Sequence, residues 1–533
     1  MFTLPPPHPT TTTTTTTMFV LTIQDIAVCV LLYVLHLGLK RSKKILPLPP
    51  GPPADPLLGH MRIMPSTGAE NAFYRWGKEY NSDIIHVSVL GQPIIVLNSL
   101  QATVDLLEKR GAIYSDRPQF AFFDMLGWYE CLLLTGYNHR SFPVHRRLMQ
   151  NYFAKSNASR FDTVQTREAR NLVKGITEHP ERWQDYLNKY STGIIIQLIT
   201  GHEIKTLDDV YLQIASDVRT TMNSGGTAGA TGVDLIPLLR FLPSWCDLSG
   251  STSFVRKWRH AIWNIYNVPF ERVQADVKAG VAQPSLMLSA MQEMDAQEEG
   301  ADTLTEERIK GLCATAFAGG ADTTFDTLTT FVFGIVNYPD VQERAREELD
   351  RVVGPDRMPD FADREYLPYV ERVMYESFRF WPVTPLGPPH KSTEDDVYNG
   401  MFIPKGSLVL FNAFAMTHDE SVYADPWRFD PDRYLPREEG GRGEPLPTVQ
   451  FGFGRRVCPG RVVGETNIFI AIATMLHVLT INKAKDAAGN EITVDPETAK
   501  YTTGLTSHPE TVLCNIVPTS ERAKRLAMAY HVE

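Results

Sequence analysis

The chain has 533 residues, with 52 lysines and arginines against 62 aspartates and glutamates and a formal net charge of −10. This length and ordinary composition predict one large domain, or two to three of average size. The sequence lacks the basic field that nucleic-acid binding needs, which excludes that class of partner. The six cysteines are scattered without a CxxC pair. That pattern is typical of a reducing compartment rather than of a disulfide framework or a zinc site.

Residues 1–17 contain an unbroken threonine run and are predicted to be disordered. Residues 18–39 are mostly apolar, and as a helix they would span about 33 Å, close to the thickness of a bilayer core. A secretory signal is the alternative, but the basic residues follow this segment and no small-residue cleavage site is present. The sequence therefore predicts one transmembrane anchor over 18–39, with the following chain in the cytosol. The basic, proline-rich residues 40–56 predict a stiff hinge.

Helical patterning dominates residues 100–353 of the body. Extended patterns are shorter, at 84–89, 94–97, 407–410 and 511–517, and the first two flank a turn at 91–93, which predicts a hairpin. The sequence thus predicts a mainly α domain with a small β-sheet region over 57–520, followed by a C-terminal tail over 521–533.

The most apolar helical pattern ends before Pro339 and is predicted to begin near Thr303, where Thr303 and Glu306 fit a capping box. A helix that is apolar on nearly every face is buried in a domain centre or spans a membrane.

The middle of this pattern contains two adjacent glycines, Gly319 and Gly320, followed by Asp322 and Thr323. Two glycines inside a helix cost about 2 kcal/mol relative to alanine. They predict either a close approach by a flat group or a local widening of the helix. A buried aspartate and threonine beside them need partners or a purpose.

Cys458 lies in a glycine-rich segment, 451–460, that precedes a helical pattern starting near Val463. Backbone N–H groups at the start of a helix and a cation such as Arg456 would favour the thiolate. Taken alone, Cys458 would favour the alternative of a buried free cysteine.

The spacing of Phe451, Gly454, Arg456, Cys458 and Gly460 resembles the FxxGxRxCxG haem-binding loop of the cytochrome P450 family. Three further segments match that family in order: 320–323 its oxygen-binding helix motif, 376–379 its ExxR element, and 429–433 the segment whose arginine meets that element. The resemblance extends from the anchor to about residue 518. It implies the cytochrome P450 fold, haem b as cofactor, and Cys458 as the axial ligand of the haem iron.

The resemblance also implies roles for single residues. Asp322 would relay protons and Thr323 would hold the oxygen ligand and a water; the alternative for Thr323 is a hydroxyl bonded to its own helix backbone. The residues expected to contact the cofactor are Cys458, Arg456, Arg146, His390, Phe451 and Gly320, of which Arg456, Arg146 and His390 would meet the propionates. Phe142 stands where the family usually has a tryptophan, so an indole donor to a propionate is missing.

Glu376, Arg379 and Arg433 are expected to have a structural role. Glu376 and Arg379 are three residues apart on one face of a helix. By resemblance the pair is buried, and Arg433 completes a network that supports the cysteine loop. Removal of one member would leave an unpaired buried charge and cost about 3–5 kcal/mol.

The resemblance implies a monooxygenase that acts on a lipophilic small molecule with O₂. Its pocket would be built from 120–128, Ala316, Gly319, 383–386 and the loop around Leu505. Electrons would come from the membrane-bound NADPH–cytochrome P450 reductase, docked on lysines and arginines of the cysteine side. The protein would be a single-pass protein of the endoplasmic reticulum with a cytosolic catalytic domain.

The segments 367–390 and 502–510 look similar to those of fungal members that tailor secondary metabolites. A terpenoid is the first substrate hypothesis, and an aromatic polyketide or alkaloid the second. Two alternatives remain open: a haem-thiolate isomerase or peroxide-rearranging enzyme, against which Asp322 and Thr323 argue, and a non-enzymatic membrane haem sensor.

Overall fold

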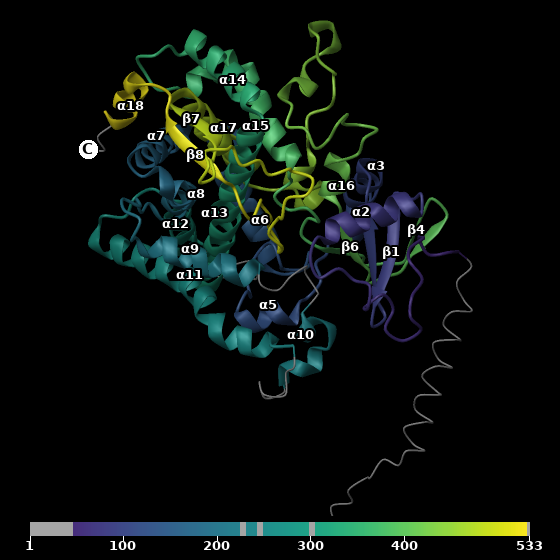
Figure 1. The fold of residues 1–533 in the computed structure, drawn as a ribbon. Coiled ribbons are helices and arrows are strands. Elements are labelled where there is room, and N and C mark those ends of the chain that lie inside the picture. The colour runs from purple at the N-terminus through teal and green to yellow at the C-terminus, as the bar shows by residue number, and fades with distance from the viewer. Residues whose placement is uncertain (1–45, 224–230, 242–248, 298–303, 530–533) are drawn as a thin grey trace, which may run out of the picture. The chain divides into compact units, whose positions relative to one another are not determined.

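The computed structural model describes residues 46–223, 231–241, 249–297 and 304–529 (Figure 1). The chain divides into two units: 1–48 with 397–402, and 49–396 with 403–533. In the first, the Phe402 N–H donates to the Pro47 carbonyl oxygen over 2.7 Å. The second contains all the candidate site residues. The predicted disordered segment and anchor, 1–39, lie outside the described residues.

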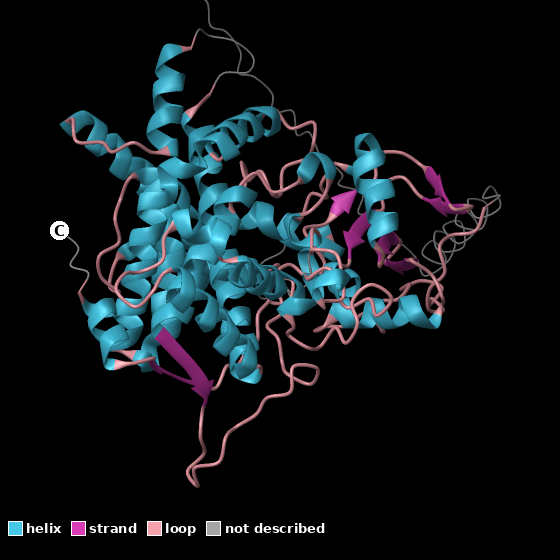
Figure 2. Ribbon diagram, turned by 90° about the horizontal axis from the view of Figure 1, so that it is seen from above, coloured by secondary structure: helices cyan, strands magenta, loops and turns pink. Residues whose placement is uncertain are grey.

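Helices make up most of the second unit, with the strands in small sheets (Figure 2). The helices are α2 (Ala69–Glu79), α3 (Leu100–Thr103), α4 (Gly111–Tyr114), α5 (Ala121–Leu126), α6 (Ser141–Tyr152), α7 (Asp162–Glu178), α8 (Trp183–Thr200), α9 (Val210–Asn223), α10 (Gly232–Leu235), α11 (Ser251–Ala279), α12 (Leu286–Ala296), α13 (Glu306–Asn337), α14 (Pro339–Val352), α15 (Pro368–Phe380), α16 (Ala413–Thr417), α17 (Arg461–Val478) and α18 (Glu521–Met528). The predicted mainly α architecture is confirmed.

The largest sheet has four strands in the order β1-β2-β6-β3. The bounds of all strands are β1 (Ile84–Val89), β2 (Gln92–Leu97), β3 (His390–Lys391), β4 (Asp396–Tyr398), β5 (Met401–Ile403), β6 (Leu408–Phe411), β7 (Leu479–Lys483) and β8 (Cys514–Pro518). The predicted hairpin forms, but its turn is Leu90-Gly91, since Val89 already pairs with Gln92. Both turn residues have positive φ, 48° and 85°, as a tight hairpin turn requires.

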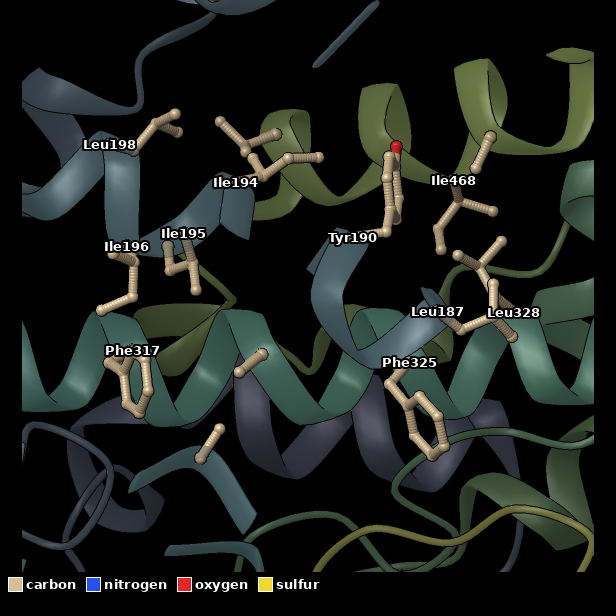
Figure 3. Packing of buried hydrophobic residues seen from close by; sticks show 14 of the residues in the cluster. Leu187, Tyr190, Ile194, Ile195, Ile196, Leu198, Phe317, Phe325, Leu328 and Ile468 are labelled. Atoms are coloured by element: carbon tan, nitrogen blue, oxygen red, sulfur yellow. The ribbon is translucent and has the colours of Figure 1, made fainter. Parts of the chain in front are cut away.

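The helix α13 runs through the core, packed against α8 and α17 (Figure 3). Phe317 and Leu328 of α13 are fully or almost fully buried, as are Ile194 of α8 and Ile468 of α17. Tyr190 of α8 is buried as well, and its hydroxyl donates to a backbone carbonyl of α17 over 2.7 Å. The all-round apolar pattern of α13 is therefore that of a core helix.

Two helices begin at side-chain caps. The α13 helix begins at Glu306 with Thr305 as its cap, and the Thr305 side chain accepts the Arg308 N–H, whereas the predicted cap residue, Thr303, lies outside the described residues. Residues 521–528 form α18 instead of a tail, because Ser520 caps this helix and its Ala523 and Ala527 face are buried. The end of α13 before Pro339 is confirmed.

Among the described residues, only α17 is long and apolar enough to cross a membrane. Its apolar window is 72% buried inside the protein, as expected for a core helix.

The two central glycines of α13 differ in their surroundings. A Cβ at Gly320 would lie 2.7 Å from Cγ1 of Ile195 in α8, whereas a Cβ at Gly319 would meet no atom within 4 Å. Gly320 thus allows α8 and α13 to pack closely, and Gly319 lies on an open side of the helix.

We expect Gly320→Ala to lower the free energy of unfolding by about 1–3 kcal/mol, because the added methyl group overpacks the helix interface. Gly319→Ala is the matched control, which should cause no loss because its methyl group enters open space. Denaturant-induced unfolding of both variants checks this, and equal stability of the two would contradict it.

Candidate active site

The loop before α17 is held by its own backbone and by one aromatic ring. The Cys458 N–H donates to the Phe451 carbonyl oxygen over 2.8 Å. Gly454 has φ 55°, and a Cβ there would lie 2.3 Å from the Leu107 carbonyl oxygen, so only glycine fits. The Phe451 ring lies against Gly464 in the first turn of α17. These contacts hold Cys458 two residues before the helix cap.

The Cys458 side chain is exposed, yet protein surrounds it closely enough that burial raises the pKa of its thiol. Both observations hold if the sulfur faces a hollow inside the protein. The Gly460 N–H and the charges of Arg146 and Arg461 oppose this rise and favour the thiolate. The expected backbone N–H at the start of α17 therefore acts on Cys458. Arg456, the cation expected to favour the thiolate, is not among the groups that act on it.

Arg456 instead bonds backbone carbonyls and lies over an aromatic ring. Its guanidinium donates to the carbonyl oxygens of Ser115, Leu132 and Thr135 over 2.8–3.2 Å. It also lies 4.1 Å from the centre of the Phe142 ring, a cation–π distance. The phenylalanine that replaces the family's usual tryptophan therefore positions Arg456 through its ring face.

Arg146 of α6 lies at the cysteine loop. Its Nη1 donates to the Val457 carbonyl oxygen over 2.5 Å, directly before Cys458. This contact supports the loop and brings a positive charge to the sulfur. Contact of Arg146 with a propionate stays a prediction.

A further buried cation, Arg117, was not predicted. It is 5% exposed and donates to the carbonyl oxygens of Pro388 and Pro389, while no described residue accepts from its Nε. Its charge and that of Arg456 act on each other and on His390. The signal available in the sequence was weak: one arginine in a loop, without a motif.

His390 is buried beside Arg117, and its Nδ1 lies 2.7 Å from the Tyr114 carbonyl oxygen. Burial and the charge of Arg117 lower the pKa of His390 well below its usual value, so the ring is neutral. In the tautomer that donates to Tyr114, Nε2 has no proton to give. Nε2 of His390 could therefore donate to a carboxylate only if the ring gained a second proton. The negative charge of that carboxylate would favour this protonation.

The predicted network of Glu376, Arg379 and Arg433 is present, and all three side chains are fully buried. Arg379 donates to both Glu376 oxygens over 2.8 and 2.9 Å, and Arg433 donates to Oε1 over 3.1 Å. The sequence analysis missed a fourth member, Glu444, which accepts from Arg433 over 2.6 Å. Two carboxylates thus balance two guanidinium groups, which a three-member network could not achieve.

Glu376 remains ionised inside this network. Burial alone would raise its pKa, but the charges of Arg379 and Arg433 outweigh burial and lower the pKa below its usual value. The Tyr434 hydroxyl and the Asp430 N–H donate to it as well, over 2.7 and 2.9 Å. Both Glu376 oxygens, although buried away from water, therefore accept hydrogen bonds from the protein.

The middle of α13 brings together Gly319, Thr323 and Asp322. The Thr323 hydroxyl donates to the Gly319 carbonyl oxygen over 2.6 Å, which is the backbone bond of the alternative interpretation. Its oxygen can still accept a hydrogen bond. Gly320, predicted to contact the cofactor, packs against α8 instead of facing the open side, and its contact with a cofactor stays a prediction.

Asp322 is 4% exposed and pairs with Arg219 of α9, an unpredicted partner, over 2.9 Å. Burial raises the pKa of Asp322 to about 6, although Arg219 opposes the rise. Arg219 also donates to the Asn188 side chain of α8 over 3.0 Å. Asp322 can therefore gain or lose a proton near neutral pH, which a proton relay requires.

Apolar side chains gather beside Arg117. One small pocket is lined by Phe120, Phe123, Leu133, Leu134, Met222 and Leu505, together with Arg117 and nearby prolines. Two of the regions expected to form the substrate pocket, 120–128 and the loop around Leu505, thus meet.

Three observations fit a flat anionic porphyrin with a metal centre. The Cys458 thiol is accessible, Gly319 leaves one side of α13 open, and Arg117 and Arg456 share one carboxylate, Asp116, whose charge acts on both. One carboxylate does not neutralise two guanidinium groups, and haem propionates would supply the missing negative charge. The residues present therefore fit haem: Cys458 would be the iron ligand, and Arg117 and Arg456 would meet the carboxylates.

The cytochrome P450 family model matches residues 49–499. Cytochrome P450 monooxygenase 98 of Postia placenta is 35% identical over 96% of this chain and 96% of its own. A cytochrome P450 monooxygenase of Armillaria gallica is 36% identical over 94% of this chain and 98% of its own. A solved zebra fish cytochrome P450 with abiraterone has a TM-score of 0.67 at 22% identity, covering 85% of this chain and 100% of that one, which shows the fold alone.

The chain belongs to the cytochrome P450 family. Its fungal relatives are monooxygenases, and family and fold together make it a monooxygenase of the haem-thiolate class. Members of this class use O₂, a lipophilic substrate and electrons from a redox partner.

We expect Glu444→Gln to lower the free energy of unfolding by about 3 kcal/mol, because Arg433 loses its second carboxylate inside the protein. Glu439→Gln, at an exposed position near it in sequence, is the matched control. Denaturant midpoints of the two variants measure the difference. A midpoint of Glu444→Gln equal to that of the control would show that Glu444 does not balance the network.

Proposed function

We propose that this protein inserts one oxygen atom from O₂ into a lipophilic small molecule, with haem b held by Cys458. The observation that supports this most is the pairing of two features: an accessible thiol in a rigid loop, and a titratable Asp322 next to Thr323 on the open part of α13. The first suits iron ligation and the second suits proton delivery.

Haem, when bound, supplies the activation of O₂ with two electrons from a redox partner. The protein residues do the rest. Arg146, Arg461 and the Gly460 N–H oppose the rise that burial causes in the Cys458 pKa, and so favour negative charge on the sulfur. The charges of Arg456 and Arg117 would neutralise the propionates, whereas the neutral His390 ring would donate to one of them only after gaining a proton.

Thr323 and Asp322 would move protons. Because the Thr323 hydroxyl donates to Gly319, its oxygen is free to accept a proton donor such as water. Asp322 would hand protons to this group, and Arg219 would keep its carboxylate oriented. Asp322 is buried, whereas the Thr323 hydroxyl lies on the open side of α13, so a proton would pass from a buried acid to an accessible group.

The pocket residues support a lipophilic substrate, since Phe120, Phe123, Leu133 and Leu505 present carbon atoms. We propose a fungal secondary metabolite, a terpenoid first and an aromatic polyketide or alkaloid second. The fungal sources of the similar monooxygenases support the setting.

NADPH–cytochrome P450 reductase is the proposed electron donor. Arg455 is exposed on the cysteine loop, and Arg147 and Arg461 are half exposed on the helices that flank it, so basic groups are available for docking. A membrane anchor over 18–39 and a cytosolic catalytic domain at the endoplasmic reticulum complete the proposal.

A peroxide-rearranging or isomerising enzyme would not need external protons or electrons. The buried, paired and titratable Asp322 favours oxygen activation over that alternative and over a haem sensor. Isotopically labelled O₂ tests the choice directly. With NADPH, reductase and a terpenoid panel, one labelled oxygen atom in the product is expected, whereas product formed without oxygen uptake would contradict the proposal.

We expect Asp322→Asn to lower the rate of product formation about 100-fold or more, because the amide cannot relay protons. The pKa of Asp322, about 6, also predicts an ionisation in the wild-type pH–rate profile that this variant lacks. Below that pH the carboxyl is protonated, and above it the carboxylate prevails.

Asp340→Asn, with a 61% exposed side chain, is the control for removal of one negative charge. Haem content, measured spectroscopically, should be unchanged in both variants. An Asp322→Asn enzyme with wild-type rate and pH profile would exclude Asp322 from the relay.

A further inference from the structure

A second acid–base pair lies one helical turn from Asp322 on α13. Asp326 is 1% exposed, and its Oδ1 lies 2.8 Å from Nδ1 of His508 in the C-terminal loop. Within the described part of the chain, no donor makes an aligned hydrogen bond to either Asp326 oxygen. The contact is therefore an ion-pair contact. Because a buried carboxylate without hydrogen bonds is unstable, Asp326 needs a charged imidazole or a proton of its own.

This pair acts electrostatically on Asp322. Residues four apart on a helix lie on one face, so the Asp322 and Asp326 carboxyls are neighbours. After burial and Arg219, the next influences on the pKa of Asp322 come from the same cluster: the charge of Asp326 raises the pKa and that of His508 lowers it. The Phe325 ring lies between the basic groups, 4.4 Å from the Arg219 guanidinium carbon and 5.5 Å from the His508 ring.

The charges of the four groups do not balance without one further proton. Arg219 stays protonated and neutralises one carboxylate. The second carboxylate is neutral only if it binds a proton or if His508 is protonated. Among the three groups that can exchange protons, His508 is the most exposed, at 16% against 6% and 2% for the side chains of Asp322 and Asp326. Solvent thus has its best access at the imidazole.

We propose that Asp326 and His508 form a second acid–base pair of the relay, in which the cluster with Asp322 and Arg219 holds one exchangeable proton that His508 draws from solvent. For each proton that leaves Asp322 toward Thr323, one proton enters at the imidazole, so the charge of the cluster is restored. Asp326 and His508 are positioning residues, since they act through Asp322. The inference rests on the proposed monooxygenation.

The elements packed around the cluster contribute few other polar groups. The α9 helix contributes Arg219, α8 the neutral Asn188, and α13 the two aspartates. The C-terminal loop contributes His508 and Thr502. The Thr502 hydroxyl lies 3.4 Å from Nδ1 of the His508 ring and accepts the backbone N–H of His508 over 3.0 Å. Within the described residues, the charges that act on the Asp322 carboxyl are therefore those of this cluster.

The test measures protonation of Asp322 without turnover. Infrared difference spectra of the ferric holoenzyme follow the carbonyl band of a protonated carboxylic acid against pH. His508→Gln removes a positive charge and should raise the pH at which Asp322 is half protonated. Asp326→Asn removes a negative charge and should lower that pH, each change being about 0.5–2 pH units. Asp322→Asn assigns the band.

A matched control is His202→Gln, because His202 forms a similar pair with Asp209 over 2.8 Å, away from α13. His508→Arg places a permanent positive charge at this position, so it should restore the midpoint of Asp322 but not proton uptake. In steady-state assays, His508→Gln should form product per NADPH about 10-fold less efficiently than His202→Gln, with unchanged KM.

The proposal would be overturned if the two variants did not move the pH midpoint of Asp322 in opposite directions. It would also be overturned if His508→Gln and His202→Gln formed the same amount of product per NADPH. If the midpoints move as expected but the wild-type enzyme incorporates no oxygen from O₂, the proposed function fails and the coupled cluster stands. The two failures are therefore distinguishable.

Discussion

The buried contact between Glu376 and its two arginines is the constraint on which the active-site loop depends. The α15 helix carries Glu376 and, two residues later, Phe378. The Phe378 ring packs edge-on against the Phe451 ring, with 5.5 Å between the ring centres. Phe451 in turn accepts the backbone N–H of Cys458. A charge network that fixes α15 thus fixes the cysteine through a short chain of contacts. Such a network is stable only when every charge has a partner, which explains the presence of Glu444.

Electrostatics also organise the other wall of the site. In α13 the sequence places two aspartates one turn apart, where unpaired they would repel each other. Arg219 and His508, from segments about 290 residues apart in sequence, bring basic groups to them. The core therefore accommodates two acids instead of excluding them.

The fold class and the local motifs could be predicted from the sequence, because apolar periodicity and fixed spacings lie within short segments. The end of α13 at Asn337, the hairpin of β1 and β2, and the pair of Glu376 with Arg379 are of this kind. Partners from distant segments could not be predicted. Glu444, Arg117 and Arg219 carry no local pattern that distinguishes them from surface residues.

The same limit explains the errors of detail. Arg456 was expected to stabilise the Cys458 thiolate because it is near in sequence, but the loop turns its guanidinium toward carbonyls of a segment more than 300 residues earlier. The two glycines of α13 looked equivalent in sequence, yet α8 packs on only one of them.

The most direct measurement is the reduced, carbon-monoxide difference spectrum of the purified protein and of Cys458→Ser. Ligation of haem iron by the Cys458 thiolate predicts a strongly red-shifted Soret band in the wild type that Cys458→Ser abolishes. A band at the position typical of histidine-ligated haem, its persistence in Cys458→Ser, or no haem band in folded protein would contradict the central claim.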